Sequence, residues 1–179
     1  MKQINSLTGM ADLIEDKSKP DELAIKVFHT EETLKKIFKS FAMSEIRTPA
    51  LESTNLFKRS VGDTSDIVNK ELYTFSDKND KSITLRPEGT ASVIRSIVEK
   101  KLDGETHKLW YMGPMWRYER PQKGRFRQFY QAGVEILGYP EGTSEFEMIS
   151  LVCELNRKLL IKKPLIKINH LGDSETKKQ

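Results

Sequence analysis

The chain has a single cysteine among its 179 residues, which excludes an internal disulfide and favours a reducing compartment. It also lacks an apolar run long enough to span a membrane and an N-terminal signal-peptide pattern. We therefore expect a cytoplasmic protein without a membrane segment. Cys153 falls in an apolar helical pattern, which predicts a core thiol rather than a nucleophile.

Several well-known chemical motifs are missing as well. Neither the phosphate-binding pattern GxxxxGKS/T nor the dinucleotide pattern GxGxxG occurs. His29, His107 and His170 are scattered without the spacing of zinc ligands, so no metal site is predicted. No Ser/His/Asp set can be argued, and covalent catalysis is therefore not the leading hypothesis.

The residues that are present indicate one globular domain with a proper core. Charged residues make up 31% of the sequence and hydrophobic residues 37%, which is typical of a soluble protein. The net charge of +4 permits contact with nucleic acid or nucleotides without requiring it.

Apolar periodicity predicts an α+β fold with a largely antiparallel sheet flanked by helices. A helix of about twenty residues is expected to start near Ser18 and Pro20, and shorter helices are expected at 56–61 and after Pro87. A second long helix is predicted at about 143–160, with Phe146, Ile149, Cys153 and Leu160 facing inward. Strands are predicted at 45–47, 72–75, 83–86, 108–119, 126–137 and 165–170.

The segment 113–138, GPMWRYERPQKGRFRQFYQAGVEILG, carries unusually many polar groups for a strand pair. They are Arg117, Glu119, Arg125, Gln131 and Glu135. Charged side chains are costly to bury unless they meet partners. The pair is therefore either the floor of a ligand site or a hairpin with a solvated outer face.

Alternation along the strands predicts which of these side chains share a face. From Phe126 onward, one face is mostly apolar and suits packing, whereas the other carries Phe129, Gln131 and Glu135. A three-residue turn at 122–124 would place Arg117 opposite Phe129, so that all four side chains share that second face.

A second polar cluster, RPEGT at 86–90, lies between a predicted strand and a predicted helix. An acid in the first turn of a helix suits the helix dipole, so Glu88 and Thr90 are interpreted as a capping device. Beside Arg117, the same cluster becomes an acidic pocket for a cation such as an α-ammonium group.

These segments resemble the histidyl-tRNA synthetases, a family of class II aminoacyl-tRNA synthetases, from Thr8 to the end of the chain. The long helix and the strand ending in IRTPALE resemble motif 1 of the class, at about 21–52. WRYE, a loop and RFRQF resemble motif 2, at about 110–138, and ITLRPEGTA narrows the likeness to the histidine family. One departure from the family lies at Ile14-Glu15-Asp16, soon after the segment GMAD, where the family usually has a proline.

The resemblance implies a class II catalytic-domain fold and a role for each matching position. Arg117 would hold the ATP α-phosphate and the histidine carboxylate, and Arg125 would meet the γ-phosphate. Glu119 would recognise adenine and later the tRNA end, while Phe129 would stack on adenine and Mg²⁺ would bridge the phosphates. The histidine-binding set would be Glu88, Gly89, Thr90, Arg117, Gln131 and Glu135, with Glu135 accepting a hydrogen bond from the imidazole.

The implied activity is ligation of L-histidine to tRNA(His) with ATP, by a homodimer formed through motif 1. Motif 3 and an anticodon-binding domain are not found in these 179 residues, so we expect an incomplete catalytic domain with weak or no activity alone. Two alternatives are a histidine-binding paralogue, such as the regulatory subunit of ATP phosphoribosyltransferase, and a dimerisation fragment without catalysis. The presence of Arg117, Glu119, Arg125 and Phe129 favours the ligase over the paralogue.

Overall fold

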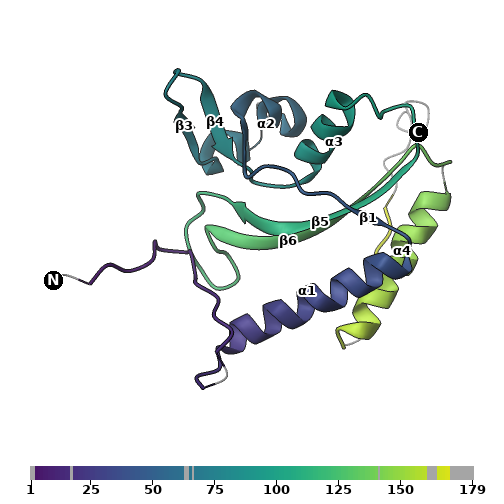
Figure 1. The fold of residues 1–179 in the computed structure, drawn as a ribbon, viewed down its shortest axis with the longest axis horizontal. Coiled ribbons are helices and arrows are strands. Elements are labelled where there is room, and N and C mark those ends of the chain that lie inside the picture. The colour runs from purple at the N-terminus through teal and green to yellow at the C-terminus, as the bar shows by residue number, and fades with distance from the viewer. Residues whose placement is uncertain are drawn as a thin grey trace.

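A curved two-stranded ribbon runs through the middle of the molecule and separates two layers (Figure 1). The structure is a computed structural model, and it describes residues 3–16, 18–62, 65, 67–140, 142–160 and 165–169. Helices α1 (Glu22–Ser40) and α4 (Thr143–Lys158) cover one face of the ribbon. Helices α2 (Thr54–Val61) and α3 (Thr90–Glu99) lie on the other side, with a small sheet. The predicted α+β fold is confirmed.

The central sheet has the order β1-β5-β6. Strands β5 (His107–Trp116) and β6 (Gln128–Leu137) pair antiparallel over their full length, and the short β1 (Ser44–Glu45) runs parallel to β5. The two predicted long strands are therefore confirmed with shifted bounds, since β5 ends at Trp116 instead of 119 and β6 begins at Gln128 instead of 126. The strand predicted at 45–47 is the parallel neighbour, shifted to 44–45.

The connection between β5 and β6 differs from the predicted three-residue turn. Gln122 and Arg125 pair around a two-residue turn, whereas Arg117 is bonded to Arg127 through its backbone N–H, at 2.9 Å. Residues 118–121 on one side thus oppose residue 126 alone on the other. Met115, not Arg117, lies opposite Phe129. The prediction was wrong by two positions, and a shift of two keeps every side chain on its predicted face.

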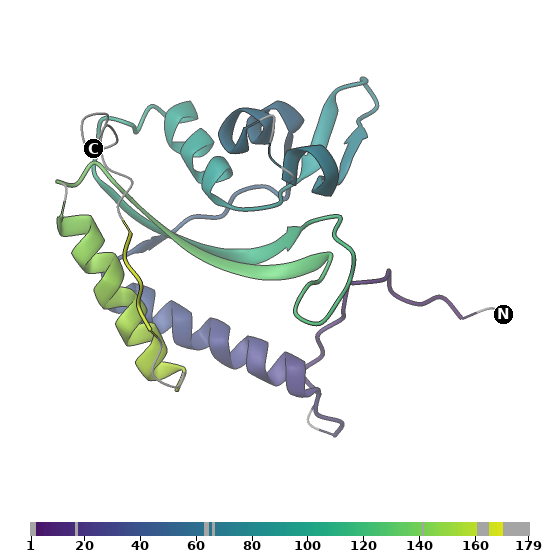
Figure 2. The same ribbon diagram turned by 180° about the vertical axis from the view of Figure 1, so that it is seen from behind.

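The larger core cluster lies between the central sheet and the two long helices (Figure 2). Its buried members are Leu34, Ile37, Phe38, Met43, Trp110 and Leu151. The rings of Phe38 and Trp110 stack with centroids 5.2 Å apart. Helix α1 starts later than predicted, because the carboxylate of Asp21 accepts hydrogen bonds from the backbone of Leu23 and Ala24 and so acts as the cap.

The predicted inward face of α4 was wrong except at Ile149, which is half-buried. Phe146 is 73% exposed, Leu160 is 87% exposed and Cys153 is exposed, so the expected core thiol is a surface thiol. The helix has two apolar stripes, and the one that packs on the core contains Met148, Leu151 and Leu155. Tertiary packing decided between the stripes, and the sequence pattern does not distinguish them.

A smaller antiparallel sheet stands on the other side of the ribbon, in the order β2-β4-β3. The predicted hairpin is confirmed with shifted bounds, as β3 (Thr74–Ser76) and β4 (Ser82–Leu85). Strand β2 (Leu51–Ser53) and the π-helical turn η1 (Ile67–Glu71) were not predicted. Residues 165–169 are extended chain without strand pairing, and position 170 of that predicted strand lies outside the described residues.

Among the described residues, no helix combines the length and apolar character needed to cross a membrane.

Candidate functional site

The sheet face turned toward α3 carries Arg117, Gln131 and Glu135 of the polar set that the sequence singled out. The Nε of Arg117 donates to the carbonyl of Pro87 at 3.0 Å, and its guanidinium lies 5.0 Å from the centre of the Phe129 ring. The end of β5 is thereby joined to the loop before α3. Among the described residues, no carboxylate lies within ion-pair distance of Arg117. Its terminal nitrogens are therefore suited to an anionic ligand.

The loop before α3 brings the carboxylate of Glu88 close to that of Glu135 in β6. Glu88 accepts from the backbone N–H groups of Thr90 at 2.6 Å and Ala91 at 3.0 Å, so the predicted capping role is confirmed for Glu88, whereas the predicted cap from the Thr90 side chain was wrong. The hydroxyl of Thr90 donates to Glu135 Oε1 at 2.7 Å. Burial raises the pKa of Glu135 and the nearby Glu88 charge adds to that rise, while the bond from Thr90 acts against it. A bound cationic group would stabilise the charged forms of both carboxylates.

Buried polar atoms without a hydrogen-bond partner lie in and near the site, where a ligand could supply the bond. In the part of the chain that the structure describes, these are Gln131 Oε1, Glu119 Oε2 and Ser92 Oγ. A buried acceptor that receives no hydrogen bond costs about 1–3 kcal/mol of folding stability, so such atoms are rare in folded proteins. Gln131 lies between Phe129 and Glu135 along β6, whose six-residue separation spans about 20 Å. This face can therefore accommodate an extended ligand.

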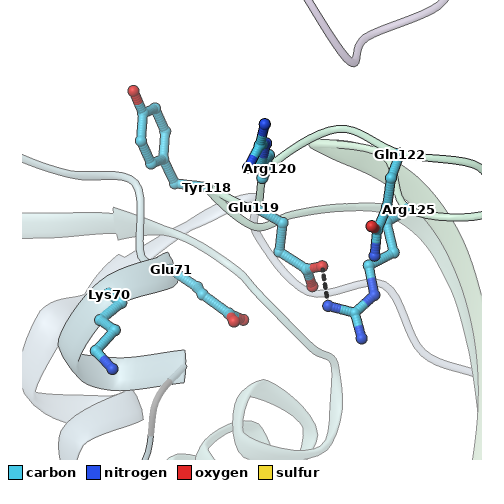
Figure 3. A pocket seen from close by; sticks show the side chains of 7 residues that line it. All are labelled: Lys70, Glu71, Tyr118, Glu119, Arg120, Gln122 and Arg125. Carbon is cyan, nitrogen blue, oxygen red and sulfur yellow. Dashed lines mark ion pairs between the residues drawn. The ribbon is translucent and has the colours of Figure 1, made fainter.

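Glu119 and Arg125 lie apart from this face, in a pocket of about 340 Å³ at the loop end of the ribbon (Figure 3). Its lining residues are Lys70, Glu71, Tyr118, Glu119, Arg120, Gln122 and Arg125. Glu119 Oε2 forms an ion pair with Arg125 Nη1 at 3.4 Å, without the geometry of a hydrogen bond. The pocket thus holds charges of both signs in loose contact.

The N-terminal segment supports this loop. The carbonyl of Gly9 accepts from the backbone N–H groups of Arg127 at 2.8 Å and Gln128 at 3.1 Å. Arg127 in turn lies 4.2 Å from the centre of the Tyr118 ring and donates from Nε to the carbonyl of Glu119 at 3.2 Å. The N-terminal segment and Arg127 therefore both help to set the position of the loop.

Two further residues of the site were missed at the sequence level. Arg86 is 9% exposed and donates to Thr48 Oγ1 at 3.0 Å, to the Thr48 carbonyl at 2.8 Å and to the Pro114 carbonyl at 3.3 Å. Burial lowers its pKa, and the Glu52 charge opposes that change. Tyr111 lies between the loop and β6. In the sequence, Arg86 lies at the end of a predicted strand and Tyr111 looks like an ordinary aromatic core residue. Only their contacts with distant parts of the chain identify them as part of the site.

Comparison with known proteins places this geometry in a family. The family model for histidyl-tRNA synthetase matches residues 14–173. The chain is 56% identical over 144 residues to the histidine–tRNA ligase of Desulfitobacterium hafniense (strain DSM 10664 / DCB-2), a match that covers 79% of this chain and 34% of the relative. It is 51% identical over 160 residues to that of Anoxybacillus flavithermus (strain DSM 21510 / WK1), covering 88% and 38%. The chain spans about a third of the length of these curated relatives.

Solved structures agree with the sequence relatives. The apo histidyl-tRNA synthetase of S. aureus superposes with a TM-score of 0.68 at 36% identity, covering 87% of this chain and 34% of that one. A Bacillus halodurans protein described as an ATP phosphoribosyltransferase regulatory subunit/histidyl-tRNA synthetase gives a TM-score of 0.71 at 21% identity, covering 89% and 39%, which shows a shared fold alone. The family match over most of the chain and the identities of about half decide the assignment: the chain belongs to the histidyl-tRNA synthetase family.

Proposed function

We propose that this chain carries histidine- and ATP-binding residues of a histidine–tRNA ligase, which activates L-histidine with ATP and transfers it to tRNA(His). The observation that supports this most is the sheet face on which Arg117, the unpartnered amide oxygen of Gln131 and the Thr90–Glu135 pair follow one another. An anion-binding end, a buried acceptor and a carboxylate end suit an extended ligand with phosphate, ammonium and imidazole groups.

The ATP end would use Arg117, Phe129, Glu119 and Arg125. Attack of the histidine carboxylate on the α-phosphate builds negative charge on the phosphate oxygens, and the planar guanidinium of Arg117 would stabilise that charge. The adenine would stack on the Phe129 ring. Arg125 would exchange its loose contact with Glu119 for the γ-phosphate, which frees the Glu119 carboxylate for adenine and later for the tRNA end. Mg²⁺ would bridge the phosphates of the bound ATP.

The histidine end would use the acidic pair and its neighbours. Glu88, Thr90 and Gln131 would surround the α-ammonium group beside the backbone of Gly89, and Glu135 would accept a hydrogen bond from the imidazole N–H. A site built around such a bond rejects a ring that lacks the donor, because the buried carboxylate would then stay unpaired. The histidine carboxylate is already ionised, so activation needs no general base.

Motif 1, at about 21–52, would form a homodimer interface, and motif 2, at about 110–138, would form the floor described above. The protein would work in the cytoplasm, where tRNA is charged. A regulatory paralogue without ligase activity would bind histidine but not need the ATP-contacting set of Arg117, Glu119, Arg125 and Phe129, all of which this chain retains.

Calorimetry with histidine and with ATP tests the proposal, together with histidine-dependent ATP–pyrophosphate exchange. We expect the chain to bind both ligands, and we expect Arg117→Lys to weaken each about tenfold, because lysine keeps the charge but loses the bidentate fork. Arg157→Lys is the control, since Arg157 pairs with Glu154 on the surface of α4, outside both motifs. Binding of histidine without ATP would support the paralogue instead. Dimerisation in a sedimentation run, without either ligand bound, would support an interaction fragment.

A further inference from the structure

Arg86 is a buried cation at a point where three segments of the chain meet. In the part of the chain that the structure describes, no carboxylate lies within ion-pair distance of its guanidinium. Burying a charge without an ionic partner is costly, and the neutral acceptors around it must offset that cost. The positions of those acceptors therefore show what the side chain holds together.

The guanidinium of Arg86 bridges the segment before β2 and the strand β5. Its Nη1 donates to the carbonyl of Thr48 at 2.8 Å and to Thr48 Oγ1 at 3.0 Å, while its Nε donates to the carbonyl of Pro114 at 3.3 Å. Its Nη2 packs over Gly113, where an added Cβ would lie only 2.9 Å away. A lysine would bring the same charge as a single ammonium group, which cannot make this set of bonds at once.

The backbone next to this side chain continues the connection toward Arg117. The N–H of Arg86 donates to the carbonyl of Ala50 at 2.9 Å, and the carbonyl of Arg86 accepts from the N–H of Trp116 at 3.0 Å. One residue further on, the buried Pro87 accepts from Nε of Arg117 at 3.0 Å through its carbonyl. The place of the Pro87 carbonyl relative to β5 therefore depends on the bonds that Arg86 makes.

We propose that Arg86 is a positioning residue for Arg117, an inference that rests on the proposed function for the ligand that Arg117 would bind. The fork of Arg86 holds the loop against β5, so the Pro87 carbonyl stays where it engages Nε of Arg117. With Nε engaged, the plane of the Arg117 guanidinium is set, and its terminal nitrogens are presented to an anionic group in one orientation. The geometry of the fork does this, and a positive charge at position 86 alone does not.

The variant Arg86→Lys tests the proposal through the Nε–H group of Arg117. Its hydrogen exchange is followed by NMR with isotope-labelled arginine at mildly acidic pH, and Arg117→Lys assigns the signal by removing it. We expect exchange to be about tenfold faster in Arg86→Lys, because the bond to the Pro87 carbonyl opens more often. The Nε–H of Arg127, which donates to the carbonyl of Glu119 at 3.2 Å, is the internal control and should exchange as before.

A milder variant decides the matter if Arg86→Lys folds poorly. Thr48→Val keeps the side-chain shape and the backbone carbonyl but removes the Oγ1 acceptor, so exchange at Arg117 should rise by only about threefold. Arg157→Lys, in a surface pair on α4, should change neither exchange rate. Unchanged exchange at Arg117, or an equal increase at Arg127, would overturn the inference, because the second result would mean a general loosening of the fold.

ATP titrations by ligand-observed NMR test what the positioning does for binding. Arg86→Lys should weaken ATP about tenfold in the original chain and less than twofold in an Arg117→Lys background, because its effect passes through Arg117. Equal losses in both backgrounds would overturn the inference and assign Arg86 a role independent of Arg117. If the original chain does not bind ATP, the proposed function fails, and the exchange rates alone then decide whether Arg86 positions Arg117.

Discussion

At the scale of single residues, Glu135 shows how the site trades stability for recognition. A half-buried carboxylate beside Glu88 is disfavoured in its charged form, and its raised pKa reflects this. The bond from Thr90 offsets part of that cost but does not remove it. A carboxylate whose ionised form lowers the stability of the fold at neutral pH is more consistent with a role in ligand binding than with a role in folding.

Replacing Glu135 with glutamine should therefore stabilise the chain at neutral pH. The folded protein holds the proton of Glu135 to a higher pH than the ordinary value of 4.5, so its stability falls as pH rises from 4.5 through the raised pKa. In Glu135→Gln this fall is absent, and we expect the melting temperature at pH 7 to rise by up to about 3 °C while histidine binding is lost. Thermal melts from pH 4 to pH 8 measure the difference.

The control is Glu105→Gln, which changes an exposed carboxylate. It should leave the melting temperature at pH 7 unchanged. A lower melting temperature for Glu135→Gln at pH 7, or a pH dependence equal to that of the original chain, would contradict the cost assigned to Glu135.

At the scale of elements, strand faces were predictable and strand register was not. Alternation placed Arg117, Phe129, Gln131 and Glu135 on one face because side-chain direction repeats every two residues whatever the pairing. The register depends on the loop, in which the backbone N–H of Tyr118 donates to the carbonyl of Glu71, while the N–H of Arg127 on the returning segment donates to the carbonyl of Gly9. Both acceptors lie far from the loop along the chain. The same limit applies to Tyr111, whose ring packs against two glycines, Gly89 preceding α3 and Gly133 in β6.

Gly9 is the element-scale contact most open to test. Its φ of +81° suits glycine, and a Cβ there would lie 3.1 Å from the backbone nitrogen of Arg127. We expect Gly9→Ala to destabilise the chain by about 1–2 kcal/mol, because it combines backbone strain with weaker bonds to Arg127 and Gln128. Urea unfolding gives the energy, and hydrogen exchange should show faster exchange at these two amides.

Gly124→Ala is the matched control, since Gly124 also has a φ of +81° but has nothing within 4 Å of the added carbon. Gly124→Ala therefore introduces the same backbone strain without a steric contact to a neighbouring residue. Equal destabilisation by the two variants, with unchanged exchange at Arg127 and Gln128, would show that Gly9 does not fasten the loop.

At the scale of the whole molecule, the two faces of one sheet carry different tasks. The face toward α1 and α4 is covered by apolar side chains, with Trp110 and Leu151 in its core. The face toward α3 carries the charged and unpartnered groups of the proposed site. Because neighbouring residues of β5 and β6 point to opposite faces, the packing layer and the ligand layer are built from the same two strands.

This division predicts that the packing layer can be weakened without changing ligand preference. Leu151 is the residue of α4 that is buried, at 2% exposure, and its truncation to alanine should cost about 3 kcal/mol. Val152→Ala, at a side chain that is 39% exposed, should cost less than about 0.5 kcal/mol. Urea unfolding measures both. At temperatures where Leu151→Ala is folded, its preference for histidine over 3-(2-thienyl)-L-alanine, an amino acid whose five-membered ring lacks an N–H, should equal that of the original chain. A changed preference would mean that the sheet transmits strain from one face to the other, and that the two layers are not independent.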